Sequence, residues 1–259
     1  IDYIPTVNSL EGKSKSIFFS ICQKLSKLIH PFKLYHHLSK RNAFNSFSKK
    51  YLLISRQKYI GEQSLVNAQF SYDAYIAGSD QIWNTRISNQ SKAYFLHFPK
   101  SGLKIAYAGS YGKEQLEELE VLYIRQYFPQ FHALSVREDS ANEFVKGLGL
   151  VSSTVLDPVF LLSSNIWESI MEELPVPKEY IFVYAMEDNE TINNIIEKYN
   201  CENLKVIYCD GGGSQLGIKG TEVTGVSPGQ FLYLIANAKL VLTNSFHGTA
   251  FSILLGKKF

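Results

Sequence analysis

The residues best suited to chemistry stand in the turn 243–248, TNSFHG, which separates two apolar runs. We expect this turn to join a strand to a helix, whose first N–H groups and dipole favour an anion such as phosphate or carboxylate. His247 could exchange a proton near neutral pH, because the ordinary pKa of histidine is about 6.5. Gly248 would let the backbone approach a ligand closely. The competing interpretation is that Asn244 or Ser245 caps the helix and that His247 packs.

Other polar residues follow other predicted strands, and ligands of open α/β sheets bind beyond the carboxyl ends of the strands. Arg137 lies at the end of the predicted strand that begins at Ala133, and arginine binds carboxylate or phosphate in a two-pronged geometry. The alternative interpretation is that Arg137 forms an ion pair with a neighbouring acidic residue. The turn 78–80, Gly-Ser-Asp, supplies the carboxylate of Asp80. The indole of Trp83 either stacks on a sugar or fills the core.

Three further features carry weaker signals. The glycine-rich stretch 210–217 lacks the Lys and Ser/Thr of a phosphate-binding loop, so we interpret it as a flexible loop. The pair His36 and His37 has no acidic or cysteine neighbour, so no metal site is expected there. The three cysteines lack metal-ligand spacing and are interpreted as structural thiols.

Alternating strand and helix patterns position these residues and predict parallel sheets with helices on both faces. We expect an N-terminal domain over 1–163, with a basic helical insert at about 13–58, and a C-terminal domain over 164–259. The opening IDYIP is typical of the end of a strand and the closing GKKF of the beginning of one, so we expect a chain trimmed at both ends. The predicted strands are 72–77, 104–110, 133–138, 154–160, 180–186, 204–210 and 239–243.

Composition restricts the class of protein. The chain has 259 residues, of which 45% are hydrophobic and 19% charged, as in globular proteins. No apolar run reaches the roughly 18 to 20 residues that span a bilayer, and no signal peptide is visible, which predicts a cytoplasmic protein. Residues 1–61 hold eleven basic and two acidic residues, a charge of +9, whereas the remainder carries −7. The local charge argues against a nucleic-acid partner, and the basic segment is either a solvated face or a surface for anionic lipid.

The chain resembles the polysaccharide pyruvyl transferase family in four segments, which run in the family's order from Tyr72 to Phe259. The last of them is long and specific. The resemblance implies a two-domain fold of two doubly wound Rossmann-like domains, similar to glycosyltransferase B, with the donor in the cleft between them. The segments are YDAYIAGSDQIWN, LSVRE, VLDPVF and SPGQFLYLIANAKLVLTNSFHGTAFSILLGKKF.

The resemblance also implies a reaction. Family members transfer pyruvate from phosphoenolpyruvate to two hydroxyls of a sugar as a ketal, with no other cofactor and no metal. The acceptors of such enzymes are often lipid-linked saccharides at a membrane face. The family's arginine at the strand end falls on Arg137 and its histidine on His247, while a further arginine of relatives is Ser245 here. We expect Asp80 to act on an acceptor hydroxyl. The predicted substrate-binding residues are Gly78, Ser79, Trp83, Asn244, Ser245, Phe246 and Gly248.

Two alternatives stay open at this point. A nucleotide-sugar glycosyltransferase could use the same architecture, because a fold does not determine a function. A non-catalytic saccharide-binding relative could also retain it.

Overall fold

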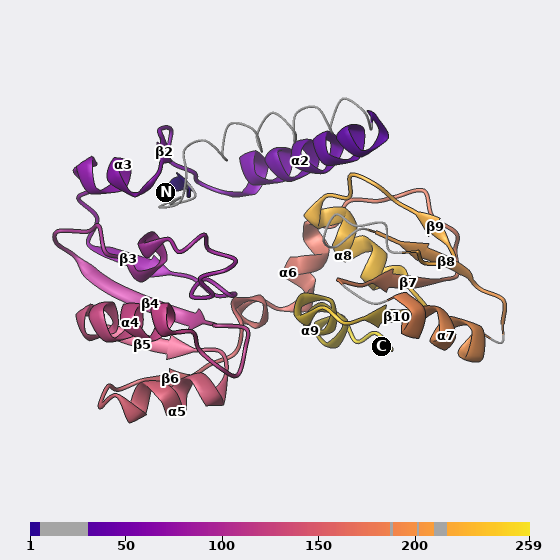
Figure 1. The fold of residues 1–259 in the computed structure, drawn as a ribbon. Coiled ribbons are helices and arrows are strands. Elements are labelled where there is room, and N and C mark those ends of the chain that lie inside the picture. Colours follow the sequence, from indigo (N-terminus) through magenta and orange to yellow (C-terminus); the bar gives the residue numbers. More distant parts are fainter. Residues whose placement is uncertain (6–30, 187–188, 201, 210–216) are drawn as a thin grey trace. The chain divides into compact units, whose positions relative to one another are not determined.

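The computed structural model describes residues 1–5, 31–186, 189–200, 202–209 and 217–259. They form two compact units, each with its own parallel sheet (Figure 1). The first unit contains residues 1–5 and Ile54–Leu161, and the second contains residues 31–53 and the described part of Leu162–Phe259. The mixed α/β class with parallel sheets is therefore as predicted.

The main sheet of the first unit has four parallel strands in the order β3-β4-β5-β6, so each strand lies beside the next one in the chain. A separate parallel pair joins β1 to β2. The elements of this unit are β1 (Asp2–Ile4), β2 (Lys58–Ile60), α3 (Glu62–Asn67), β3 (Ala74–Ala77), η1 (Lys92–Phe95), β4 (Leu103–Gly109), α4 (Glu118–Tyr127), η2 (Phe128–Gln130), β5 (Ala133–Val136), α5 (Asp139–Gly147), β6 (Ser153–Thr154) and η3 (Pro158–Leu161).

Aromatic side chains fill the core of the first unit. Trp83 is 0% exposed and packs against Phe128, with ring centroids 4.6 Å apart. Its Nε1 donates to the carbonyl of Tyr94 at 3.2 Å. A Cβ at Gly109, the last residue of β4, would overlap the indole ring. Close packing of the indole thus requires glycine at the end of this strand.

The second unit has four parallel strands in the order β10-β7-β8-β9. The chain moves from β7 through β8 to β9 and then returns to the other side of β7 with β10. The elements of this unit are α2 (Pro31–Tyr51), α6 (Ser164–Ser169), β7 (Tyr180–Tyr184), α7 (Asn189–Tyr199), β8 (Lys205–Tyr208), β9 (Thr221–Glu222), α8 (Pro228–Asn237), β10 (Leu240–Thr243) and α9 (Phe246–Leu254).

Helices cover both faces of this second sheet, because successive side chains of a strand point to opposite faces. Ile181 and Val183 of β7 belong to one buried cluster with Ile192 of α7. Phe182 of β7 instead lies against Phe231 of α8, with centroids 6.1 Å apart. The strand β7 is therefore buried on both sides, as expected of a parallel sheet.

The run Ser227-Pro228-Gly229-Gln230 is typical of a capped helix start, and Ser227 does cap α8 in a reciprocal capping box with Gln230. Ser140 and Glu143 have the same spacing and predict a second capping box. That prediction is wrong, because α5 already begins at Asp139 and its N-cap is Glu138. The predicted strand 154–160 is also too long: β6 ends at Thr154, and the chain then turns into η3.

The basic segment differs from the expectation in its placement. Residues 13–30 of the predicted basic helical insert lie outside the described residues. The structure describes the helix α2 from Pro31 to Tyr51. It belongs to the second unit and not to the N-terminal one. Ser39 of α2 lies where a Cβ of Gly225 would stand, and Lys50 lies 3.9 Å from Glu172.

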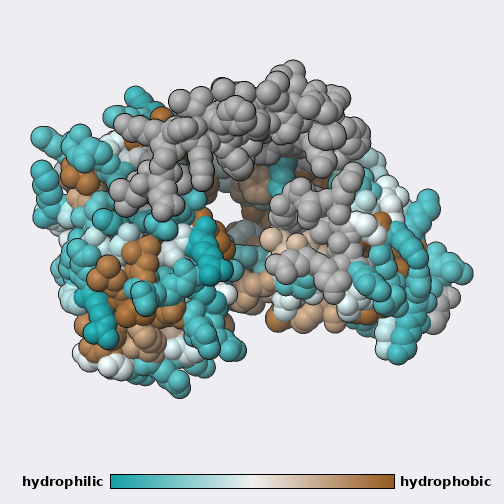
Figure 2. All heavy atoms as spheres, viewed as in Figure 1, coloured by the Kyte–Doolittle hydropathy of each residue, from teal (hydrophilic) through white to brown (hydrophobic). Residues whose placement is uncertain are grey.

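On the face of the first unit that Figure 2 shows, apolar side chains gather in a brown area bordered by hydrophilic ones. Among the apolar residues of this unit, Val151 and Leu122 are 91% and 57% exposed. Apolar atoms form a large part of the surface of most globular proteins. Among the helices that the structure describes, none combines the length and apolar composition needed to cross a bilayer.

Candidate functional site

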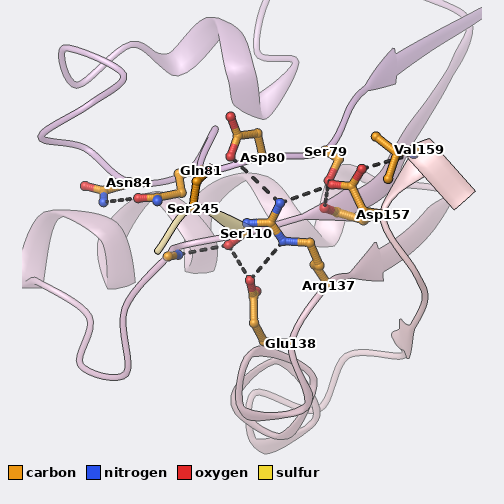
Figure 3. A network of polar contacts seen from close by, with 12 residues as sticks. Ser79, Asp80, Gln81, Asn84, Ser110, Arg137, Glu138, Asp157, Val159 and Ser245 are labelled. Atoms are coloured by element: carbon orange, nitrogen blue, oxygen red, sulfur yellow. Dashed lines mark hydrogen bonds and ion pairs between the residues drawn. The ribbon is translucent and has the colours of Figure 1, made fainter. Parts of the chain in front are cut away.

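In the first unit, polar side chains from three consecutive strand ends meet at the carboxyl edge of the sheet (Figure 3). Ser79 follows β3, Ser110 follows β4 and Arg137 follows β5. A fourth residue, Asp157, follows β6 and is 3% exposed. Because parallel strands present their carboxyl ends at one edge, residues that are far apart in the sequence form one network there.

Asp157 is the centre of this network. Its Oδ2 accepts from Ser79 Oγ at 2.7 Å and from Arg137 Nη1 at 3.1 Å, and its Oδ1 accepts from Val159 N at 3.1 Å. The Arg137 side chain is only 8% exposed. A buried carboxylate beside a buried guanidinium is stable only when such hydrogen bonds satisfy both groups.

Two further carboxylates face Arg137. Glu138 Oε1 accepts from Arg137 Nε at 3.2 Å and from Ser110 Oγ at 2.6 Å. Asp80 Oδ1 lies 3.8 Å from Arg137 Nη1. The ion pair that was the alternative interpretation of Arg137 is therefore present, and three carboxylates gather around one guanidinium.

Asp80 combines an exposed side chain with a constrained backbone. Its side chain is 64% exposed, and its φ of 73° lies in the left-handed region, which aspartate tolerates better than most residues. Its carbonyl accepts from Ser110 N at 3.0 Å, which ties the end of β3 to that of β4. The carboxylate is thus held at the rim of the network and remains accessible to a ligand.

Tyr111, next in the chain after Ser110, is 3% exposed, and its hydroxyl has no hydrogen-bond partner in the described part of the chain. Burial raises the pKa of Tyr111 well above its ordinary value, and the carboxylates of Glu138 and Glu120 raise it further. The phenol therefore stays protonated and neutral at any physiological pH.

In the second unit, the turn after β10 lies at the point where the strand order reverses. The carboxyl ends of β7 and β10 are neighbours, although the chain leaves them toward opposite sides of the sheet. In open α/β sheets this position is the usual ligand crevice. Asn244 Oδ1 accepts from Met186 N at 2.7 Å, and Thr243 Oγ1 donates to the carbonyl of Tyr184 at 2.6 Å. The predicted site thus stands at the topological switch point of its sheet.

Ser245 is the N-cap of α9, as the competing interpretation proposed. Its Oγ accepts from Gly248 N over a long 3.5 Å, and its own N donates to Thr243 Oγ1 at 3.1 Å. Packing also requires glycine at position 248, because a Cβ there would overlap Thr243 Oγ1. The glycine permits a close approach of Thr243, whereas the sequence had indicated a ligand.

His247 and Phe246 occupy the first turn of α9. Their rings are perpendicular, with centroids 5.2 Å apart. Phe246 is 45% exposed and His247 is half-buried. An imidazole in the first turn of a helix at the switch point is suitably placed to exchange a proton with a bound ligand.

Trp83 must be removed from the predicted substrate-binding residues. The indole was expected to lie beneath a sugar or to fill the core, and the structure shows the second alternative, with no exposed face. Exposed Gly78 and half-buried Ser79 remain at the edge. The sequence had indicated Asp157 and Glu138 as polar residues that follow strands, and Glu138 as an ion-pair partner of Arg137, but neither was among the predicted site residues. Glu138 is next to Arg137 in the chain, whereas the contact of Asp157 with Arg137 depends on the order of the strands.

Other predicted features stay untested. Most of the glycine-rich stretch 210–217 lies outside the described residues, as do Cys22 and Cys201, and the side chains of His36 and His37 are not described. Cys209 is buried and forms no disulfide with another described residue. Within the described residues, no three His, Cys, Asp or Glu side chains are grouped as metal ligands would be.

Comparison with protein families identifies the family of this chain. The family model described as polysaccharide pyruvyl transferase matches residues 17–259, nearly the whole chain. The chain belongs to the polysaccharide pyruvyl transferase family. Comparisons with curated proteins and with solved structures gave no match. The family match includes both strand-end groups, the network around Arg137 and the turn before α9. The candidate residues of this pyruvyl transferase family member therefore lie within the matched region, at the carboxyl edges of its sheets.

Proposed function

We propose that this protein transfers pyruvate from phosphoenolpyruvate to two hydroxyls of a saccharide, in the synthesis of a cell-surface or exported polysaccharide. The family match over residues 17–259 carries the proposal. We also propose that the two units are doubly wound domains of a glycosyltransferase-B-like fold. Two observations support this fold for the second unit: helices pack on both faces of β7, and the strand order reverses at β10.

The proposed chemistry requires two additions to one carbon. A first sugar hydroxyl adds to the carbon that bears the phosphate ester and loses its proton, and the methylene carbon takes up a proton and becomes a methyl group. The C–O bond to phosphate then breaks, and a second hydroxyl attacks the same carbon and loses its proton. One phosphoenolpyruvate and two hydroxyls thus give one ketal and one inorganic phosphate.

The residues have separate roles in this proposal. His247 is the general acid and base for the proton that moves to the methylene carbon. The start of α9 favours the negative charge of the donor, because the helix dipole is positive there. In the first unit Arg137 binds the donor's carboxylate or phosphate, and Asp80 orients or deprotonates the acceptor hydroxyl. The 64% exposure of Asp80 supports its role, since a substrate hydroxyl can reach it.

Phosphate release in the presence of an acceptor tests the function directly. His247→Ala and Arg137→Ala should each reduce turnover by about a hundredfold or more, the usual scale for a general acid–base or an electrostatic group. Normal turnover in either variant would reject its role. Ser227→Ala, which changes the cap of α8, is the control for loss of fold.

Ligand-induced thermal shift tests the donor separately. Phosphoenolpyruvate should raise Tm, and a nucleotide sugar should not, because only a ligand that binds the folded state stabilises it. The reverse result would favour a glycosyltransferase on the same architecture.

We propose further that the protein works in the cytoplasm at the membrane face, where it meets a lipid-linked acceptor. The sequence charge of +9 over residues 1–61 supports this, and so does α2, where Leu38 and Phe44 are exposed in a helix that carries Arg41 and Lys49. Flotation with vesicles that contain phosphatidylglycerol, at low and high salt, provides the test. Absence of salt-sensitive binding would reject the membrane contact.

A further inference from the structure

A pocket of about 500 Å³ in the first unit has no part in the proposed chemistry. It lies between β2, α3 and the segment that follows α3, and it shares no residue with the network around Arg137. Its volume is in the range typical of small-molecule sites, about 300 to 1,000 Å³. The lining side chains that carry the inference are Gln57, Tyr59, Ser64, Asn67, Gln69 and Phe70.

The lining is polar but uncharged. Three primary amides, one phenol and one aliphatic hydroxyl share it with an aromatic ring. Each amide offers two N–H donors and one carbonyl acceptor, and each hydroxyl both donates and accepts. Ligands whose own groups donate and accept together, such as adjacent sugar hydroxyls, match this set. A phosphate or carboxylate ligand would find no cation among the lining residues.

The aromatic wall of the pocket is supported from behind. The ring of Phe70 lies 5.1 Å from that of Tyr59 and 5.5 Å from that of Phe98. Phe98 and Tyr75, which also contacts Phe70, are 8% and 4% exposed and belong to the core. The wall is therefore rigid, so a ligand that packs its C–H face on it would not have to order it first.

The amides are available to a ligand. The side chains of Gln57 and Gln69 are exposed and make no hydrogen bond to any residue that the structure describes. Asn67 Oδ1 accepts from Gln63 Nε2 at 2.8 Å, which orients its amide, and Ser64 Oγ donates to the carbonyl of Gly61 at 2.7 Å. The pocket thus combines two adaptable amides with two polar groups in fixed orientation.

We propose that this pocket binds a neutral sugar unit of a polymeric acceptor, as a saccharide subsite separate from the reacting residues. Uncharged amides and a rigid aromatic wall carry this assignment. Its role in holding the polymer during transfer rests on the proposed function, whereas sugar binding by itself does not.

Saturation-transfer NMR on the whole chain, with neutral tetrasaccharides of glucose, mannose and galactose as probes, tests the binding. At least one probe should bind with a dissociation constant on the order of 1 mM, as expected of an open polar site. The double variant Gln57→Ala with Gln69→Ala should weaken that binding about fivefold or more, through the loss of its hydrogen bonds. Both residues are exposed, so the fold should be retained. Gln126→Ala removes an exposed amide on α4 as the matched control.

Two results would overturn the inference: none of the probes binds the unaltered protein, or the double variant binds as tightly as the control. The outcome is separable from that of the proposed function. Sugar binding through these amides without phosphate release from phosphoenolpyruvate would support the subsite and reject the transferase. If the saccharide subsite and the transferase activity are both confirmed, the double variant should raise the KM of a long acceptor and leave the KM of a disaccharide unchanged.

Discussion

At the scale of single residues, Asp157 determines how Arg137 is presented. It lies twenty residues further along the chain and is almost fully buried, yet its Oδ2 holds both Arg137 Nη1 and Ser79 Oγ. The guanidinium therefore has one main orientation before any ligand arrives. Such preorganisation is what a site for a carboxylate or phosphate requires.

We expect Asp157→Asn to lower the free energy of unfolding by about 3 kcal/mol, because it leaves a buried guanidinium without its closest countercharge. Urea denaturation measures this change. Glu114→Gln, an exposed carboxylate in the same unit, should stay within about 0.5 kcal/mol of the original protein. A loss below about 1 kcal/mol for Asp157→Asn would show that Glu138 and Asp80 suffice to hold Arg137.

The sequence predicted which types of residue stand at the candidate site better than it predicted which side chains those residues contact. Arg137, Asp80 and His247 stand at strand or helix ends because the polar residues interrupt apolar runs, and this pattern is local. Whether Arg137 meets an anion or an acid of its own chain depends on residues that follow other strands. The identity of those acids was visible, but their distance from the guanidinium was not.

At the scale of elements, the start of α4 depends on a buried carboxylate. Glu120 is 0% exposed, and its Oε1 accepts from Thr85 N at 2.8 Å and lies 2.8 Å from Lys113 Nζ. Its Oε2 accepts from Glu117 N at 2.9 Å and completes a capping box. Burial alone would raise the pKa of Glu120, but the hydrogen bonds from Lys113, Glu117 and Thr85 outweigh it and lower the pKa.

This lowered pKa predicts a pH dependence of stability. Just below the ordinary pKa of glutamate, about 4.3, the folded state keeps Glu120 ionised while the unfolded chain already binds a proton. The contribution of Glu120 to the free energy of unfolding is therefore complete above that ordinary pKa. It is lost as the pH falls through the lower pKa of the folded state. Glu120→Gln should therefore destabilise the protein near neutral pH and reduce the loss of stability between about pH 5 and pH 3.

Urea denaturation across that pH range gives the measurement. Glu118→Gln, an exposed carboxylate in the first turn of the same helix, is the matched control and should keep the original pH dependence. An unchanged acid response in Glu120→Gln would contradict the role of this carboxylate.

At the scale of the whole molecule, the assignment of α2 to the second unit is the main departure from the linear order. Its residues precede the first unit's sheet in the sequence, yet Ser39 of α2 stands against Gly225, just before α8. Gly225 has a φ of 68°, in the left-handed region. The contact therefore requires glycine both for backbone conformation and for space.

We expect Gly225→Ala to strain this backbone and to push Ser39 away, which should loosen α2. Hydrogen exchange measures the result by region, since local opening exposes amides of the affected element first. Protection should fall in α2 and at the start of α8 and stay unchanged in β3–β6. Gly147→Ala, where a Cβ meets no neighbour, serves as the control. Equal loss of protection in both units would show that the variant destabilises the whole fold.

By itself, the sequence determined the α/β class, the family and the residue types at the strand and helix ends, because periodicity, turn chemistry and motif order are local properties of the chain. Only the tertiary structure decided that Trp83 is core, that Asp157 and Glu138 hold Arg137, and that α2 belongs with the second unit. These outcomes depend on which strands are neighbours and on how much water each group loses. Both are properties of contacts between residues far apart in the sequence, and the local pattern around each residue does not specify them.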